Sequence, residues 1–389
     1  MERVTSMKRK ICLLGITGSI GRSTIDILKE HEDEFELISC SGFSNLKALK
    51  ECIRLIPSIK YIYFSSTYIE ELKKEYPYIY FYSEHDGFDK FLSQANYDLI
   101  INALVGFIGL KPTLYAISHN IDIALANKES LVVAGELIND LLKKHPLSHL
   151  YPIDSEHVAL LKCLKGRDLK DVHSLVLTAS GGPFKDLSRE QLKGVTLKDA
   201  LHHPSWVMGD KITIDSATMV NKGLEIIEAY HLFHVKKDQI RVLLHDESYI
   251  HSLIEMKDGS YVVDIGPHDM KIPISYALFK NSYQRVNVKP LSLEDVATLH
   301  FRKLDEDRFP SLRLARYALD KLGSLPCVFN GANEEVNLAF REGRIEFYRI
   351  EEVIEMVMNK HQVKKDLSYD ELAFIHHESR LRVKEIIGG

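Results

Sequence analysis

The chain has 389 residues, of which 45% are apolar and 27% charged. This length exceeds one ordinary hydrophobic core and predicts two or three domains of a globular protein. The net charge of −5 gives no basic field for nucleic acid, so an anionic ligand must meet local positive groups. The five widely spaced cysteines form no C-x-x-C pair, which favours reduced, packed thiols over disulfides or a zinc site.

The N-terminus, MERVTSMKRKICLLG, is basic and then apolar, as a secretory signal would be. Its apolar run is too short for a signal core, and no later stretch approaches the length needed to span a membrane. We therefore expect a cytoplasmic protein that has neither a membrane nor a nucleic acid as its partner.

A glycine-rich turn, GITGSIG, lies between a predicted strand at Lys10 to Leu14 and a predicted helix at Arg22 to His31. Its glycines do not follow the G-x-G-x-x-G spacing, and a tight turn without a ligand is the alternative. Free backbone N–H groups at a helix start nevertheless favour a pyrophosphate loop. The residues that would bind there are Thr17, Gly18, Ser19 and Ile20.

The second predicted strand, Phe35 to Cys40, ends in SGFSN, without the Asp or Glu that holds the ribose of NAD. The missing carboxylate leaves room for a 2′-phosphate and favours NADPH. Strands and helices then alternate, which predicts a doubly wound parallel sheet with ligands at the carboxyl ends of its strands, beside Ala103. The remaining elements expected are strands at 61–64, 79–82, 99–104 and 121–124 and helices at 67–75, 88–94 and 112–118.

A stretch further along, KITIDSATMVNKGLEIIEAYHLF, combines a predicted strand with a predicted helix. KITID shows β-branched alternation, and the residues from Ala217 onward place apolar side chains at helical spacing. Ser216 at the junction could cap the helix, whose start would attract phosphate. Asn221, Lys222 and Glu225 would share one helix face. A solvated surface helix with a Lys222–Glu225 pair is the alternative.

Two carboxylates, Asp154 and Glu156, stand two positions apart in YPIDSEH. In an extended backbone they would project to the same side, with Ser155 opposite. Taken alone they indicate a solvated patch, but together with Glu225 they would offer three oxygen ligands. Such ligands suit Mg²⁺ or Mn²⁺, with Co²⁺ as a further candidate, rather than zinc.

Two loops could complete the site. The predicted strand in LTASGGPF ends in a glycine turn at which Ser180 could donate to phosphate, although a simple loop is the alternative. The segment HHPSWVMGD carries His203, Trp206 and Met208 between Pro204 and Gly209, which is typical of a lid, with a buried tryptophan as the alternative.

These motifs, with ALANKESLV at 124–132, resemble those of the 1-deoxy-D-xylulose 5-phosphate reductoisomerase family. The resemblance covers essentially the whole chain. It departs at Ile16, at HDES (245–248), at Gly331 and at His268, where the family usually has proline. It implies a metal site of Asp154, Glu156 and Glu225, and catalytic roles for Lys128, Glu156 and Lys222. Substrate contacts would be Lys128, Ser155, Glu156, Ser180, His203, Ser216, Asn221, Lys222 and Glu225, and cofactor contacts Thr17, Gly18, Ser19, Ile20, Ser44, Asn45, Ala103, Asn127, Glu129, Gly209 and Met270.

The expected fold class is α/β, with a Rossmann-like NADPH domain at 1–150 and an α+β catalytic domain at 151–284. A linker at 285–310 and a C-terminal helical bundle domain at 311–389 would follow. The residues alone indicate an NAD(P)- and metal-dependent enzyme acting on a small phosphorylated substrate. The resemblance implies a homodimer that converts 1-deoxy-D-xylulose 5-phosphate to 2-C-methyl-D-erythritol 4-phosphate. A metal-dependent hydroxy-acid dehydrogenase and a redox sensor without turnover are the alternatives.

Overall fold

The computed structural model describes residues 7–202 and 209–388. The chain forms two compact units, and each draws on separated stretches of the sequence. The first unit comprises Met1–Asn127, Asp140–Asp154 and Asp269–Val288, and the second Lys128–Asn139, Ser155–His268 and Lys289–Gly389. The contiguous domains expected from the sequence remain a prediction. A division of the chain into compact units does not test where its functional domains begin and end.

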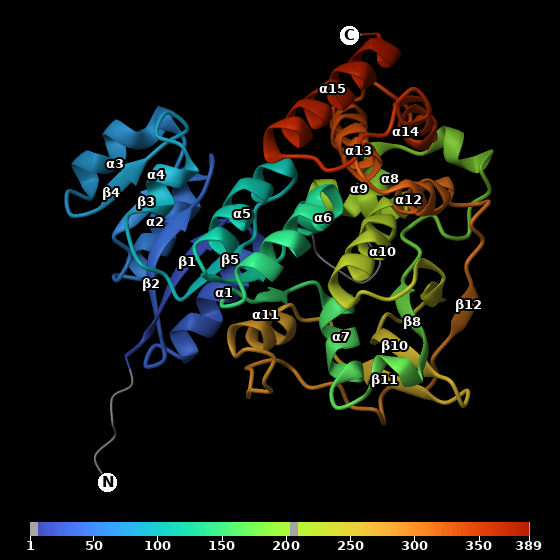
Figure 1. The fold of residues 1–389 in the computed structure, drawn as a ribbon, viewed down its shortest axis with the longest axis horizontal. Coiled ribbons are helices and arrows are strands. Elements are labelled where there is room, and N and C mark those ends of the chain that lie inside the picture. The colour runs from blue at the N-terminus through green and yellow to red at the C-terminus, as the bar shows by residue number, and fades with distance from the viewer. Residues whose placement is uncertain (1–6, 203–208, 389) are drawn as a thin grey trace. The chain divides into compact units, whose positions relative to one another are not determined.

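The first unit is built on a seven-stranded sheet in which every paired neighbour is parallel (Figure 1). Its spatial order is β4-β3-β2-β1-β5-β6-β7, so the chain reverses its direction across the sheet between β1 and β5. The predicted doubly wound parallel sheet is confirmed. The strands are β1 (Arg9–Leu14), β2 (Phe35–Ser41), β3 (Tyr61–Tyr63), β4 (Tyr80–Tyr82), β5 (Leu99–Asn102), β6 (Asp122–Leu125) and β7 (Leu150–Pro152).

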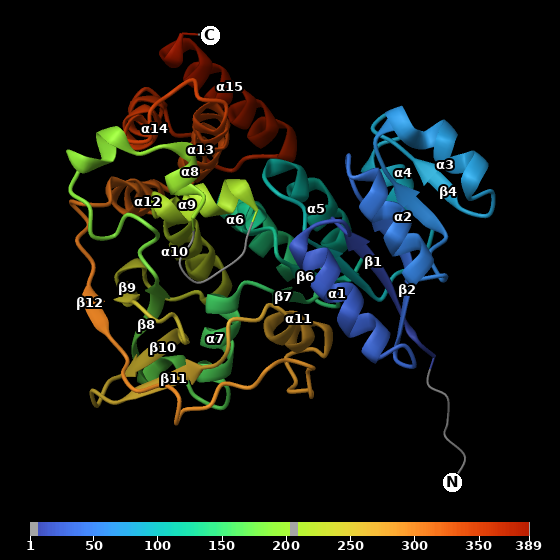
Figure 2. The same ribbon diagram turned by 180° about the vertical axis from the view of Figure 1, so that it is seen from behind.

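Helices cover this sheet, which is why strands such as β1 bury apolar residues from both faces. The helix α11 comes late in the sequence, yet it contacts α1, β6 and β7 (Figure 2). Its residues Ile274, Ala277 and Leu278 share one core with Ile11 and Leu13. The helices of this unit are α1 (Ser19–Glu30), α2 (Leu46–Leu55), α3 (Ile69–Glu75), α4 (Phe88–Leu92), α5 (Leu110–Ser118) and α11 (Lys271–Leu278).

The second unit contains a mixed five-stranded sheet in the order β11-β10-β8-β9-β12. β8 runs parallel to β9, and the other pairs are antiparallel. The predicted linker contributes β12, a short strand that the sequence analysis did not anticipate. The strands are β8 (Val172–Ala179), β9 (Ile240–His245), β10 (Ile250–Met256), β11 (Tyr261–Ile265) and β12 (Phe301–Lys303).

The C-terminal helices gather around α13, which contacts α9, α12, α14 and α15 (Figure 1). The predicted C-terminal helical region is confirmed. Helix α6 (Lys128–Lys144) is kinked at Ala134 and gives its first twelve residues to this unit. The other helices are α7 (Ser155–Leu164), α8 (Leu197–Ala200), α9 (Asp210–Ala217), α10 (Val220–Phe233), α12 (Pro310–Lys321), α13 (Leu325–Arg341), α14 (Arg349–Asn359) and α15 (Tyr369–Ile387).

The prediction of a strand at KITID is wrong, because these residues belong to α9. Two contacts favour the helix over the β-branched pattern: Lys211 pairs with Asp215 one turn later, and the Thr213 hydroxyl donates to the Gly209 carbonyl. Ser216 therefore lies in the last turn of α9 and does not cap α10. Thr218 and Met219 separate the two helices. Met219 is buried and has a left-handed backbone (φ 62°), which is unusual for a residue other than glycine.

The extended backbone expected at Asp154 to Glu156 is also wrong. β7 ends at Pro152 and α7 begins at Ser155, so Glu156 lies in the first turn of a helix. A carboxylate there interacts favourably with the positive end of the helix dipole.

All five cysteines are free and buried, which confirms the packed thiols. In the part of the chain that the structure describes, the helices are too short or too polar to cross a membrane.

Candidate active site

The glycine turn after β1 lies against the loop after β5. This is the point at which the chain reverses the direction in which it adds strands to the sheet. A Cβ at Gly15 (φ 86°) would stand 2.5 Å from the Ala103 carbonyl oxygen, so only glycine permits this approach. Gly18 occupies the N-cap position of α1 without a side-chain cap. The first backbone N–H groups of α1 are therefore available to an anion.

Other residues expected at the cofactor have partners within the first unit. Ser44 and Asn45 are exposed, and the Asn45 side chain caps α2 by accepting the Ala48 N–H at 3.1 Å. The buried Asn127 amide donates to the carbonyls of Leu104 and Gly106, both at 2.9 Å. Asn127 therefore fixes the loop beyond β5. Met270, at the N-cap of α11, packs against the core of this unit.

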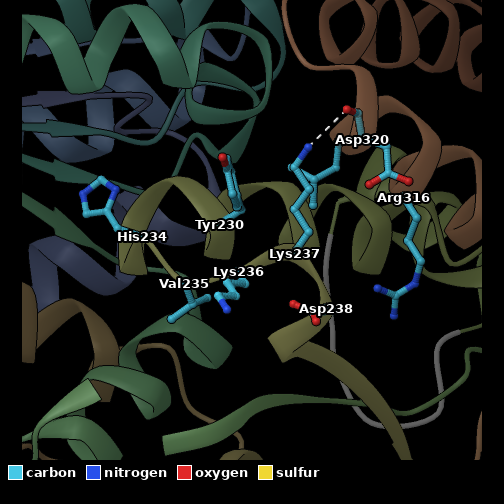
Figure 3. A pocket seen from close by; sticks show the side chains of 9 residues that line it. Tyr230, His234, Val235, Lys236, Lys237, Asp238, Arg316 and Asp320 are labelled. Carbon is cyan, nitrogen blue, oxygen red and sulfur yellow. Dashed lines mark hydrogen bonds between the residues drawn. The ribbon is translucent and has the colours of Figure 1, made fainter. Parts of the chain in front are cut away.

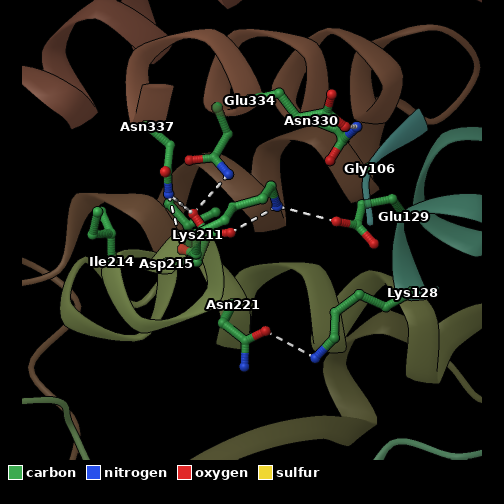
Figure 4. Close-up of polar contacts among 12 residues, drawn as sticks. Gly106, Lys128, Glu129, Lys211, Ile214, Asp215, Asn221, Asn330, Glu334 and Asn337 are labelled. Carbon is green, nitrogen blue, oxygen red and sulfur yellow. Dashed lines mark hydrogen bonds and ion pairs between the residues drawn. The ribbon is translucent and has the colours of Figure 1, made fainter. Parts of the chain in front are cut away.

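In the second unit, α10 presents Asn221, Lys222 and Glu225 together, as the spacing predicts. Lys222 and the Asn221 amide both contact the Glu225 carboxylate. Lys128, the first residue of α6, reaches the same group: its Nζ lies 2.8 Å from Asn221 Oδ1 and 3.0 Å from Glu225 Oε1. The Lys128–Asn221 contact is visible in Figure 4. The alternative of a solvated surface pair is wrong, because the Glu225 side chain is only 1% exposed.

Lys222 joins α10 to α7. Its Nζ donates to Glu156 Oε1 at 2.8 Å, and Ser155 Oγ donates to Glu156 Oε2 at 2.6 Å. Burial alone would lower the pKa of Lys222, but the charges of Glu156 and Glu225 raise it above its ordinary value. The site therefore keeps a fixed ammonium charge.

Asp154 directly precedes α7 and adds a third carboxylate. One oxygen from each of Asp154, Glu156 and Glu225 lies within 4.8 Å of the others, which is close enough for a single cation to bind all three. The three residues named from the sequence are therefore brought together, although Glu156 reaches the group from a helix rather than from a strand.

The phosphate residues expected from the sequence come from neighbouring segments. Ser180 follows β8, and its Oγ accepts the Gly182 N–H at 3.3 Å. A Cβ at Gly182 (φ 67°) would stand 2.9 Å from the Ser216 carbonyl oxygen. The glycine turn after β8 thus lies against the end of α9. His203, Trp206 and Met208, expected in a lid, fall outside the described residues, and Gly209 is the N-cap of α9.

Sequence reasoning missed a second buried group. His157 Nδ1 is 3.3 Å from Glu228 Oε2, and His157 Nε2 is 3.0 Å from the Glu225 carbonyl oxygen. Asp154, His157 and Glu228 also have ligand atoms within 4.8 Å of one another. The signal was the helical spacing, since His157 follows Asp154 by three residues and Glu228 follows Glu225 by three.

A pocket of about 680 Å³ lies at the C-terminal end of α10 (Figure 3). Its lining includes Tyr230, His234 and Arg316, and Lys237 donates to the Asp320 carbonyl at 3.1 Å. None of the residues expected in the active site lines it. The candidate site is therefore defined by the carboxylates and lysines and not by this pocket.

Comparison with known proteins gives a family for the chain. Residues 11–135 match the model of 1-deoxy-D-xylulose 5-phosphate reductoisomerase, 150–233 that of its C-terminal domain, and 265–382 a further DXP reductoisomerase C-terminal domain. The 1-deoxy-D-xylulose 5-phosphate reductoisomerase of Geobacillus sp. (strain WCH70) is 44% identical, covering 97% of this chain and 99% of that protein. The chain belongs to the 1-deoxy-D-xylulose 5-phosphate reductoisomerase family.

Other members of the reductoisomerase family agree over similar lengths. The Bacillus subtilis (strain 168) protein is 41% identical, covering 97% of this chain and all of that protein. The Zymomonas mobilis reductoisomerase, solved with NADPH, superposes with a TM-score of 0.90 at 33% identity, covering 98% of this chain and 100% of that one. A reductoisomerase solved with NADPH, fosmidomycin and magnesium gives the same TM-score and coverage at 34% identity.

His268, where the reductoisomerase family usually has proline, stacks on Tyr249 with ring centroids 4.9 Å apart. Burial lowers the pKa of His268. His245, in the other departure from the family motif, is buried, and its Nδ1 lies 2.9 Å from the His300 carbonyl oxygen. Both departures lie outside the residues expected to bind the metal.

Proposed function

We propose that this chain converts 1-deoxy-D-xylulose 5-phosphate to 2-C-methyl-D-erythritol 4-phosphate with NADPH and a divalent cation. The observation that carries the proposal is the buried group in which Lys128 and Lys222 contact the carboxylates of Glu156 and Glu225, in a chain of the reductoisomerase family. The substrate, NADPH and one proton give the product and NADP⁺, so atoms and charges balance.

The residues present fit a hard divalent cation. Asp154, Glu156 and Glu225 offer carboxylate oxygens, which Mg²⁺ and Mn²⁺ prefer, and these oxygens lie close enough to share one ion. A bound cation would supply Lewis-acid polarisation of two neighbouring substrate oxygens. Magnesium is present in solved members of the family, which supports the same choice here.

The backbone of the first unit offers two helix starts that would bind the phosphate groups of NADPH. The uncapped start of α1 at Thr17 to Ile20 suits a pyrophosphate, and the start of α2 beside Ser44 and Asn45 suits the 2′-phosphate. β2 ends at Ser41 without a carboxylate that would repel this phosphate. Bound NADPH would supply the hydride.

The chain's own groups would bind and orient the substrate. Ser180, Ser216, Asn221 and Lys222 would donate to the phosphate or to substrate oxygens. Rearrangement of the carbon skeleton gives an aldehyde, which gains a hydride at carbon and a proton at oxygen. Lys128 and Lys222 would stabilise the negative charge that develops on oxygen, because buried, fixed ammonium groups act strongly in a site of low dielectric.

The assay follows NADPH absorbance with 1-deoxy-D-xylulose 5-phosphate, with Mg²⁺ and with a chelator in its place. We expect oxidation of NADPH that requires the cation. Product analysis by NMR separates this activity from a simple hydroxy-acid dehydrogenase, which would leave the carbon skeleton unbranched. No NADPH oxidation with any divalent cation would refute the proposal.

Two further assignments belong to this proposal. We infer that the protein acts in the cytoplasm and as a homodimer, as the family resemblance implies. Light scattering coupled to size-exclusion chromatography should give about twice the mass of one 44.5 kDa chain. The mass of a single chain at micromolar concentration would contradict the dimer.

A further inference from the structure

A second lysine, with a side chain only 16% exposed, lies beside the candidate active site and bridges two carboxylates (Figure 4). Lys211 Nζ, on α9, is 3.0 Å from Glu129 Oε1 and 2.8 Å from Asp215 Oδ2. Burial alone would lower the pKa of Lys211, but Asp215 and Glu129 raise it. The bridge is therefore between charged groups. Removing one partner would leave the others uncompensated.

Helix α13, in the C-terminal region, also contacts this bridge, through two asparagine side chains. Asn333 Nδ2 and Asn337 Nδ2 donate to Asp215 Oδ1 at 2.9 and 2.8 Å, and Asn337 Nδ2 also donates to the Lys211 carbonyl at 3.0 Å. Asn333 and Asn337 stand four residues apart and so share one face of α13. Both are fully buried, which makes these hydrogen bonds costly to lose. The orientation of the Asp215 carboxylate is thereby fixed.

One partner in this bridge, Glu129, is the residue next to Lys128. Lys128 and Glu129 are the first two residues of α6, and their side chains are held by different helices. Lys128 contacts Asn221 and Glu225 on α10, whereas Glu129 contacts Lys211 on α9. The first turn of α6 is therefore held from two directions.

We propose that Lys211, Asp215, Asn333 and Asn337 are positioning residues for the reaction. They act through Glu129 to hold Lys128 against Asn221 and Glu225, so helix α13 of the C-terminal region takes part in aligning the active site. The inference rests on the proposed function of Lys128. A displacement of about 1 Å in a reacting group can cost roughly 100-fold in rate, so the loss of a buried contact that fixes this group should lower kcat.

The test compares Asn333→Ala/Asn337→Ala and Lys211→Met with the matched control Asn330→Ala. Asn330 is a buried asparagine of the same helix, but its amide donates to Glu334 Oε1 at 2.8 Å and not to α9. We expect kcat to fall roughly 10- to 100-fold in the first two variants, with KM little changed. Asn330→Ala should lower the melting temperature and leave kcat near that of the wild type. Lys211→Arg, which retains the charge, should recover much of the kcat lost in Lys211→Met.

Hydrogen exchange measured by mass spectrometry gives a readout that does not require turnover. Amides of α6 that donate to the carbonyls of its first turn should exchange faster in Asn333→Ala/Asn337→Ala than in Asn330→Ala. A wild-type protein without turnover would refute the proposed function, whereas faster exchange would still support the positioning role. If the wild type turns over and the two test variants keep its kcat, the positioning role is wrong. It is equally wrong if Asn330→Ala loses as much kcat as they do.

Discussion

Lys128 and Glu225 belong to different helices, yet Lys128 Nζ lies 3.0 Å from Glu225 Oε1, and the two side chains are only 9% and 1% exposed. Glu225 also contacts Lys222 and Asn221. One carboxylate thus receives two ammonium groups and an amide. Two cations around one buried carboxylate suit a site that is completed by further negative oxygens, such as those of a phosphorylated substrate.

Replacing Glu225 by Gln should abolish most activity while the fold survives, because glutamine keeps the size of the side chain and loses its charge. Removing one electrostatic contact to a transition state commonly costs about 10² to 10³ in rate, and a lost metal ligand should cost at least that. The Mg²⁺ concentration required for half-maximal rate should also rise. Steady-state kinetics and a Mg²⁺ titration measure both effects.

The control for this prediction is Glu352→Gln, which removes a carboxylate from a partly exposed pair with Arg349 at 3.4 Å. It should leave kcat unchanged. NADPH affinity should stay close to that of the wild type in both variants. Near-normal kcat in Glu225→Gln with an unshifted Mg²⁺ titration would remove this residue from the metal site.

The helix face of Asn221, Lys222 and Glu225 could be predicted because its spacing is local. The alternating sheet of the first unit could be predicted for the same reason. KITID could not, since its β-branched alternation favours a strand, whereas Asn333 and Asn337, which donate to Asp215 in the folded helix, lie more than a hundred residues away in the sequence. The carboxylates of Asp154 and Glu156 lie close to that of Glu225, as the grouping expects, although Glu156 lies in a helix and not in an extended segment. Three carboxylates within reach of one ion are compatible with either conformation.

NADPH should be preferred to NADH, because β2 ends at Ser41 and no acidic residue follows in the turn to α2. Introducing a negative charge by Ser44→Asp should reduce kcat/KM for NADPH by roughly tenfold or more through repulsion of the 2′-phosphate. The value for NADH should change little. Equal kcat/KM for the two cofactors in the wild type would contradict the preference.

Gly135 sets the approach of α6 to α10. A Cβ at this position would overlap the ring of His231, and Asn139, one turn later, donates to the His231 carbonyl at 3.1 Å. Gly135→Ala would ordinarily stabilise a helix, but here overpacking should cost about 1 to 3 kcal/mol of unfolding free energy. Because Lys128 begins the same helix, kcat should fall as well. Chemical denaturation and steady-state kinetics measure the two effects.

A compensating substitution distinguishes this overlap from a general weakening of α6. His231→Ala alone opens a cavity, so it should lower stability and leave kcat nearly intact. The double variant Gly135→Ala/His231→Ala should regain kcat, because the new methyl group then has space. A double variant as slow as Gly135→Ala would show that the overlap with His231 is not the cause.

His231 should also contribute to acid sensitivity. Burial, with a smaller effect from His234, lowers its pKa from 6.5 to about 4. Between these values the unfolded chain binds the proton more readily than the folded one, so stability is retained above pH 6.5 and is lost as the pH falls toward 4. This single group can account for about 3 kcal/mol. The difference in unfolding free energy between pH 7 and pH 4 should be smaller in His231→Gln by that amount, and an unchanged difference would contradict the assignment.

The contribution of α11 to the first unit affects how the protein is made. Ile274, Ala277 and Leu278 complete a core that begins with Ile11 and Leu13, yet the ribosome synthesises them after β7 and after the first stretches of the second unit. Until α11 emerges, the apolar surface that it will cover is exposed on the nascent chain, where it favours aggregation or chaperone binding. A fragment that stops at Asp154 keeps every strand of the sheet and still lacks this cover. Completion of the first unit is therefore a late event in translation.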